Sequence, residues 1–161
     1  MKRRLELLVV AGVALFDQAT KFLVVAELGL HETVGIIPGL LNLTHVRNSG
    51  VAFGFLNASS FAFKPVLMTM LAFTALIGVA LYATQLSPHQ RWARAGLALI
   101  LGGAAGNLVD RARQGYVVDF VDAYWGTWHF WAFNVADAAI SVGVSMLILD
   151  LLRPAPPLSA S

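Results

Sequence analysis

The chain has 161 residues, of which 58% are hydrophobic and only 12% are charged. Soluble domains carry roughly a quarter of charged residues, so this composition and the mean hydropathy of +0.71 indicate an integral membrane protein of one domain. The small net charge of +2 argues against a nucleic-acid groove, and the absence of cysteine excludes disulfides, thiolate metal sites and cysteine nucleophiles.

Four apolar segments are long enough to cross a bilayer, which takes ~20 residues each. We expect an all-α bundle of four transmembrane helices at residues 5–25, 61–83, 92–109 and 131–152, followed by a disordered Pro/Ser-rich tail at 154–161. Polar residues interrupt the first segment and no clear cleavage site follows, so it is interpreted as a retained anchor. The third segment is the shortest and the richest in glycine and alanine, which predicts a place at the centre of the bundle.

Four crossings put both termini on one side of the membrane. The basic N-terminus and the short loop at residues 84–94 favour the cytoplasm for that side. The loops at 26–60 and 113–130 then face outward. Residues 41–46 alternate apolar with polar side chains and predict a strand, whereas the Tyr and Trp residues of the second loop predict that it lies along the membrane surface.

Polar side chains gather at the predicted outer ends of the helices. Because successive helices alternate in direction, these positions fall at one membrane depth, near the outer face, and random polar positions would scatter over both faces. The set is Asp17, Lys21, Asn107, Asp110, Arg111, Asp119, Asn134 and Asp137.

Asp119 and Asp137 both lie within apolar runs, where a carboxylate is costly. Two carboxyls in a partly desolvated place titrate together and can share one proton near neutral pH. Aspartic proteases use this state, in which one carboxyl activates water and the other hydrogen-bonds the scissile carbonyl. The same pair would also suit an ion or proton relay, so a small transporter and a non-catalytic assembly factor remain alternatives.

Other polar residues have structural interpretations beside functional ones. Asp17 and Lys21, four apart on one helix face, form a structural ion pair in the simplest interpretation. Asp110 and Arg111 would cap and anchor the third helix, and Asn134 would be an interhelical hydrogen-bond partner. The four histidines show no ligand spacing, so we expect no metal site.

Five motifs in the same order resemble the lipoprotein signal peptidase (signal peptidase II) family of bacterial membrane aspartic peptidases. Together they span nearly the whole chain, and no motif position departs from the family pattern. They are Asp17-Gln18-Ala19-Thr20-Lys21, Asn48-Ser49-Gly50-Val51-Ala52-Phe53-Gly54, Gly106-Asn107-Leu108-Val109-Asp110-Arg111, Val117-Val118-Asp119-Phe120 and Phe133-Asn134-Val135-Ala136-Asp137.

The resemblance implies an endopeptidase of the bacterial plasma (inner) membrane that removes the signal peptide of prolipoproteins. It implies cleavage before a diacylglyceryl-modified cysteine, near the outer face, without a metal or organic cofactor. Asp119 and Asp137 match the catalytic dyad of the family. The positions that match its supporting or substrate-binding residues are Asp17, Lys21, Asn48, Gly50, Asn107, Asp110, Arg111, Asn134 and Ala136.

The resemblance also implies a small extracytoplasmic β-sheet from the first outer loop and a short surface helix over the site. The expected partners are lipid-modified prolipoproteins, membrane lipids and globomycin-type cyclic peptide inhibitors, and no nucleic acid. The expected oligomeric state is a monomer.

Overall fold

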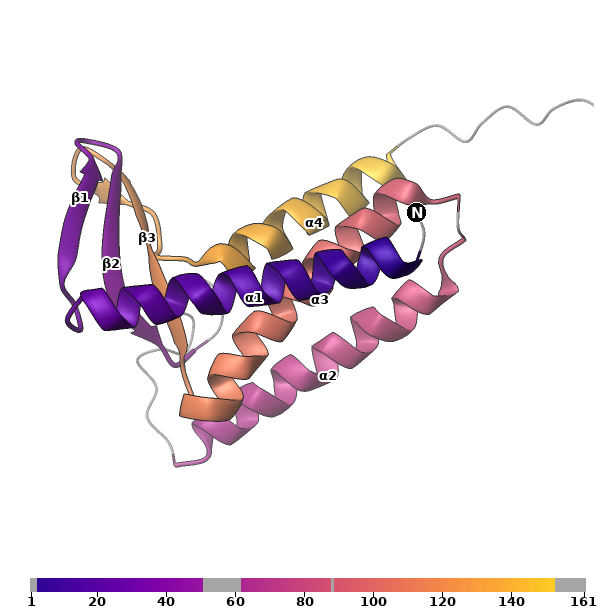
Figure 1. Ribbon diagram of the computed structural model, residues 1–161, viewed down its shortest axis with the longest axis horizontal. Coiled ribbons are helices and arrows are strands. Elements are labelled where there is room, and N and C mark those ends of the chain that lie inside the picture. The colour runs from indigo at the N-terminus through magenta and orange to yellow at the C-terminus, as the bar shows by residue number, and fades with distance from the viewer. Residues whose placement is uncertain (1–2, 51–61, 88, 153–161) are drawn as a thin grey trace, which may run out of the picture.

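The computed structural model of the chain describes residues 3–50, 62–87 and 89–152. The helices run together as a bundle, and the strands form a sheet beyond the end of the bundle where the first helix finishes and the last begins (Figure 1). The elements in chain order are α1 (Arg3–Glu27), β1 (Thr33–Ile37), β2 (Leu41–Asn48), α2 (Lys64–Gln85), α3 (Arg91–Gln114), β3 (Val117–Trp125), β4 (Trp128–His129) and α4 (Val135–Leu151).

Three of the described helices, α1, α2 and α3, are long and apolar enough to cross a membrane. Their exteriors are covered by large apolar side chains, such as Phe22 and Met70, which are 73% and 62% exposed. The buried residues, in contrast, include Asp17, Lys21 and Asp110. This distribution is the reverse of that in a soluble domain, and it suits a bundle whose outer surface contacts hydrocarbon.

Helix α3 lies at the centre of the bundle, as its small residues predicted. It packs against α1, α2 and α4, and it buries more residues than any other described helix. A Cβ added to Gly96 would lie 2.7 Å from the carbonyl oxygen of Gly143 in α4. A Cβ added to Gly103 would collide with the carbonyl oxygen of Ala136. Glycine therefore sets the distance between α3 and α4, both at the start of α4 and at its middle.

The sheet is antiparallel throughout, in the order β1-β2-β3-β4. In the pairing of β2 with β3, Leu43 opposes Val121 and Val46 opposes Asp119, so β2 carries one extra residue between these pairs. Such a bulge bends a strand and re-aims its side chains. One of the two register shifts of the described sheet therefore lies beside Asp119.

The prediction that the third helix is the shortest was wrong. Helix α3 has 24 residues, and it extends beyond the predicted 92–109 through a polar last turn. It ends at Gly115, which has a φ of 77° and donates its N–H to the carbonyl of Arg111 at 3.0 Å. A hydropathy pattern follows contact with lipid, so it stops where polar residues begin even though the helix continues to its glycine cap.

Helix α4, with 17 residues, is the shortest described helix, and it starts later than the predicted residue 131. The segment before it runs along β3 instead, because Phe133 pairs with Val121 in a two-way backbone bridge of 2.8 and 3.0 Å. The ends of α1 and α2 also differ by two or three residues from the predicted 5–25 and 61–83.

The sheet was predicted from the first outer loop alone, but β3 and β4 come from the second. The loop at 113–130 therefore pairs as strands, since Val117–Trp125 is rich in β-branched and aromatic residues. The expected surface helix is not found among the residues that the structure describes. Residues 51–54 of the second motif, the predicted start of the second helix at 61 and the tail at 154–161 lie outside the described residues.

We expect Gly103→Ala to lower the stability of the protein, because the added methyl group meets the backbone of Ala136 and the side chain of Ile140. Overpacking of this kind costs about 1–3 kcal/mol. Thermal unfolding in detergent would measure it. Gly12→Ala is the matched control, since a Cβ at Gly12 in α1 meets nothing within 4 Å. Equal melting temperatures for the two variants would contradict the close α3–α4 contact.

Candidate active site

Asn134 connects the two aspartates of the predicted dyad. It is the N-cap of α4, where its Oδ1 accepts the backbone N–H of Asp137 at 2.9 Å and its own N–H donates to Asp137 Oδ2 at 3.3 Å. Its Nδ2 donates to Asp119 Oδ1 at 2.7 Å. One fully buried side chain therefore fixes the start of α4 and, at the same time, holds the carboxyl of β3 beside it.

The remaining carboxyl oxygens are held by two further amide side chains. Asn48 at the end of β2 donates to Asp119 Oδ2 at 3.0 Å. Asn107 in α3 donates to Asp137 Oδ1 at 2.8 Å. Both carboxyls are thus oriented by neutral donors from three different elements, which restrains them without adding a formal charge.

Burial raises the pKa of Asp119 from 3.8 to about 7, and the negative charge of Asp137 contributes in the same direction. Asp119 is only 2% exposed, so its ionised form loses most of its hydration. The hydrogen bonds from Asn48 and Asn134 lower the pKa, but by less than burial raises it. A pKa of about 7 means that a substantial fraction of Asp119 carries a proton at neutral pH.

A buried ammonium lies behind the dyad. Lys21 Nζ contacts Asp17 Oδ2 at 2.8 Å, Asp110 Oδ2 at 2.9 Å and Asn107 Oδ1 at 2.8 Å. These contacts use all three donors of the ammonium group. Lys21 is 3% exposed and its two carboxylate partners are also buried, so all three ions are desolvated and depend on one another. The predicted ion pair of Asp17 and Lys21 is present, and it includes Asp110 as well.

The two carboxylates around Lys21 also hold the backbone next to the dyad. Asp17 Oδ1 accepts the N–H of Ala136 at 2.9 Å, directly before Asp137. Asp110 Oδ2 accepts the N–H of Val118 at 3.2 Å, directly before Asp119. Each carboxylate therefore positions the peptide that carries one member of the dyad.

Arg111, in the last turn of α3, contacts the backbone of the loop that follows β2. Its Nη2 donates to the carbonyl of Gly50 at 2.9 Å, and no hydrogen bond to Asp110 is present among the described residues. The N–H of Gly50 donates to Asn48 Oδ1 at 3.0 Å. Arg111 thus stabilises the turn that presents Asn48 to Asp119.

All eleven residues predicted for the site lie in this one network. Sequence reasoning missed two others, Gln18 and Lys64. Gln18 donates to Asp110 Oδ1 at 2.8 Å, and its i, i+3 spacing from Lys21 was the available signal. Lys64 is buried and donates to Ser49 Oγ at 3.0 Å, for which the sequence offers no signal. Within the described ranges, no group of three or more His, Asp or Glu side chains could hold a metal ion.

Comparison with known proteins shows the family of this chain. The model of the family described as signal peptidase (SPase) II matches residues 9–153. The chain belongs to the signal peptidase II family. It is 44% identical to the lipoprotein signal peptidase of Geobacter metallireducens over 150 residues, 93% of this chain and 91% of that protein. It is 42% identical to the one of Geobacillus kaustophilus over 149 residues, 92% of this chain and 94% of that protein.

Two solved structures, each described as a bacterial membrane enzyme, share the fold. One has a TM-score of 0.84 at 29% identity and covers 94% of this chain and 90% of that one. The other has a TM-score of 0.83 at 25% identity, with coverage of 96% and 97%. Signal peptidase II enzymes are membrane aspartic peptidases, so the resemblance drawn from the five motifs is confirmed at the level of the family.

We expect Lys21→Met to destabilise the protein by about 3–5 kcal/mol, since it leaves two buried carboxylates without a cation. Chemical or thermal unfolding in detergent would measure this. His129→Gln is the control, because it removes the partner of Asp122 in a pair whose histidine side chain is 51% exposed. Such exposed pairs contribute about 0–1 kcal/mol. Similar losses in both variants would contradict the central role of Lys21.

Proposed function

We propose that this chain is the endopeptidase that removes signal peptides from bacterial prolipoproteins, with Asp119 and Asp137 as its catalytic pair. The observation that carries the proposal is the bridge through Asn134, which binds one aspartate with its Nδ2 and the other with its Oδ1 and its backbone N–H. This bridge brings two carboxyls from different elements into one site. The family relationship supplies the reaction and the substrate class.

In the proposed reaction Asp119 is the protonated member, because it is almost fully buried. Asp137 is the ionised member, because the first turn of α4 favours a negative charge at its N-terminus. Asp137 takes a proton from water as the water oxygen attacks the scissile carbonyl carbon, and Asp119 gives its proton to the carbonyl oxygen. Asp137 then protonates the leaving nitrogen, the C–N bond breaks, and the proton of the carbonyl oxygen returns to Asp119. These steps need no metal or organic cofactor.

The proposal includes a topology. The 17 residues of α4 form a fourth crossing, which makes one membrane domain with both termini in the cytoplasm of the bacterial cell. The sheet and the dyad then lie near the outer face of the plasma membrane. A lipid attached to the substrate cysteine would keep the scissile bond at that depth. The apolar signal sequence would approach through the bilayer, and globomycin-type peptides would compete for the same site. We expect the monomer to be active.

The direct test compares cleavage of a diacylglyceryl-modified precursor by wild type, Asp119→Asn and Asp137→Asn. We expect each substitution to lower kcat by at least ~10²-fold, the lower range for general acid-base catalysis. Asp122→Asn is the matched control, since Asp122 lies on the same strand but contacts Asn42 and His129.

Near-normal cleavage by either dyad variant would show that the catalytic pair is wrong. The unmodified precursor should be cut poorly by the wild type, and equal rates on both precursors would contradict guidance by the lipid.

The pH profile of kcat/KM should fall on its alkaline side with an apparent pKa near 7, because Asp119 loses the proton that it must donate. Asn48→Ala removes a hydrogen bond that favours ionised Asp119, so the pKa should rise and the alkaline limb should move to higher pH. Rates measured across the pH range on the modified precursor would check both points. If the alkaline limb of Asn48→Ala stayed at the same pH or moved to lower pH, the assignment of the proton to Asp119 would be contradicted.

A further inference from the structure

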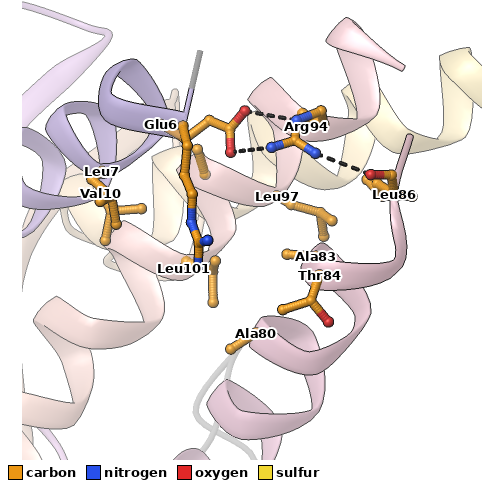
Figure 2. A pocket seen from close by; sticks show the side chains of 12 residues that line it. Glu6, Leu7, Val10, Ala80, Ala83, Thr84, Leu86, Arg94, Leu97 and Leu101 are labelled. Atoms are coloured by element: carbon orange, nitrogen blue, oxygen red, sulfur yellow. Dashed lines mark hydrogen bonds and ion pairs between the residues drawn. The ribbon is translucent and has the colours of Figure 1, made fainter. Parts of the chain in front are cut away.

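A cavity of about 440 Å³ lies between α1, α2 and α3, at the end of the bundle away from the sheet (Figures 1 and 2). Its volume is within the range of small-molecule sites. Most of its wall is formed by apolar side chains, which come from all three helices. They include Leu7, Val10, Ala80, Ala83, Leu97 and Leu101.

The polar groups of the cavity are concentrated near the ends of the helices. Arg94 binds both carboxylate oxygens of Glu6 at 2.7 Å, and its Nη1 donates to the carbonyl of Leu86 at 3.0 Å (Figure 2). This geometry neutralises Glu6 and uses each nitrogen of the Arg94 guanidinium. Arg3 also lines the cavity, and among the described residues no carboxylate pairs with it. The lining therefore carries two positive charges and one negative charge, a net charge of +1.

The surroundings of the cavity fit the boundary of a bilayer. Arg4 and Arg91 lie in the first turns of α1 and α3, at the same end of the bundle. Trp92, which follows Arg91 in α3, is 48% exposed, as is typical of aromatic side chains in the headgroup layer. Basic residues in such a layer attract anionic lipids.

We propose that this cavity binds an anionic phospholipid, with one acyl chain between the three helices and the phosphate beside Arg3. The apolar wall requires an apolar ligand, and the net positive charge of the lining requires an anionic one. A free phosphate would leave the wall without a partner. The basic N-terminal region of a signal peptide would meet a rim of its own charge. The lipid satisfies both conditions.

The test uses the full-length protein purified in a mild detergent and native mass spectrometry with added lipids. We expect wild type to retain phosphatidylglycerol in preference to phosphatidylcholine with the same acyl chains. Arg3→Gln should weaken retention of phosphatidylglycerol about fivefold, which corresponds to the ~1 kcal/mol contributed by one basic residue near an anionic lipid. Arg4→Gln is its matched control, because Arg4 carries the same charge on the next residue but does not line the cavity.

A second pair of variants tests the apolar part of the cavity. Ala80→Phe would place a ring in the cavity from an exposed position on α2, so it should lower retention without disturbing the packed core. Ala75→Phe adds the same ring at an exposed position of α2 outside the cavity, and it should retain lipid as wild type does. Melting temperatures equal to that of wild type would confirm that each variant is folded.

Several results would overturn the proposal. Equal retention of the two lipids, or equal losses in Arg3→Gln and Arg4→Gln, would show that no headgroup is recognised at Arg3. Retention by Ala80→Phe equal to that of Ala75→Phe would show that the acyl chain lies elsewhere. Displacement of the lipid by glycerol 1-phosphate would identify a site for a soluble phosphate, and displacement by a synthetic signal peptide would identify a substrate site.

Discussion

The site depends on the contacts that the buried ammonium group of Lys21 makes with its neighbours. A buried charge is stable only when it is paired and hydrogen-bonded, and Lys21 meets this requirement through Asp17, Asp110 and Asn107. The two carboxylates in turn hold the peptide N–H groups of Ala136 and Val118. A shift of any one of these groups would leave a buried charge or N–H group without a partner. The contacts therefore hold α1, α3, β3 and α4 in one arrangement, and this arrangement positions Asp119 and Asp137.

The local charge balance explains how a proton can remain on the dyad. The region around it holds four carboxyl groups, those of Asp17, Asp110, Asp119 and Asp137. Two cations act on these groups electrostatically, Lys21 and Arg111. If all four carboxyls were ionised, two negative charges would be uncompensated in a desolvated site. One proton on the pair reduces the excess to a single charge, which the amide donors and the N-terminus of α4 can stabilise.

The sequence predicted those parts of the site that follow from short-range spacing and from hydropathy. The helical spacing predicted that Asp17 lies beside Lys21. The alternation of helix direction predicted that the polar ends of the helices lie together. The sequence could not predict contacts that depend on the sheet, such as the bulge in β2 that lies beside Asp119. It also missed the pair of Glu6 and Arg94, because these residues are 88 positions apart and each is an ordinary polar residue in its own helix.

Helix boundaries were predicted less well for a related reason. Hydropathy reports where a chain contacts lipid, whereas helices end where their backbone groups find other partners. In α3 the partner is the cap at Gly115, and before α4 it is the bridge between Phe133 and Val121. The end of α3 depends on a single glycine, and the start of α4 depends on the backbone of β3. Neither can be predicted from a count of apolar residues.

The distribution of buried polar groups also favours hydrolysis over ion transport as the function of the site. A relay across the membrane needs polar side chains at successive depths. In the described part of the chain, the buried polar cluster lies at the sheet end, and the pair of Glu6 with Arg94 at the other end neutralises itself. Between them α3 buries Leu97, Ala98 and Ile100. The hydroxyl of Ser145 in α4 donates to its own helix, at the carbonyl of Ser141. The carboxyls therefore form a local site at one end of the bundle, as an enzyme of this kind requires.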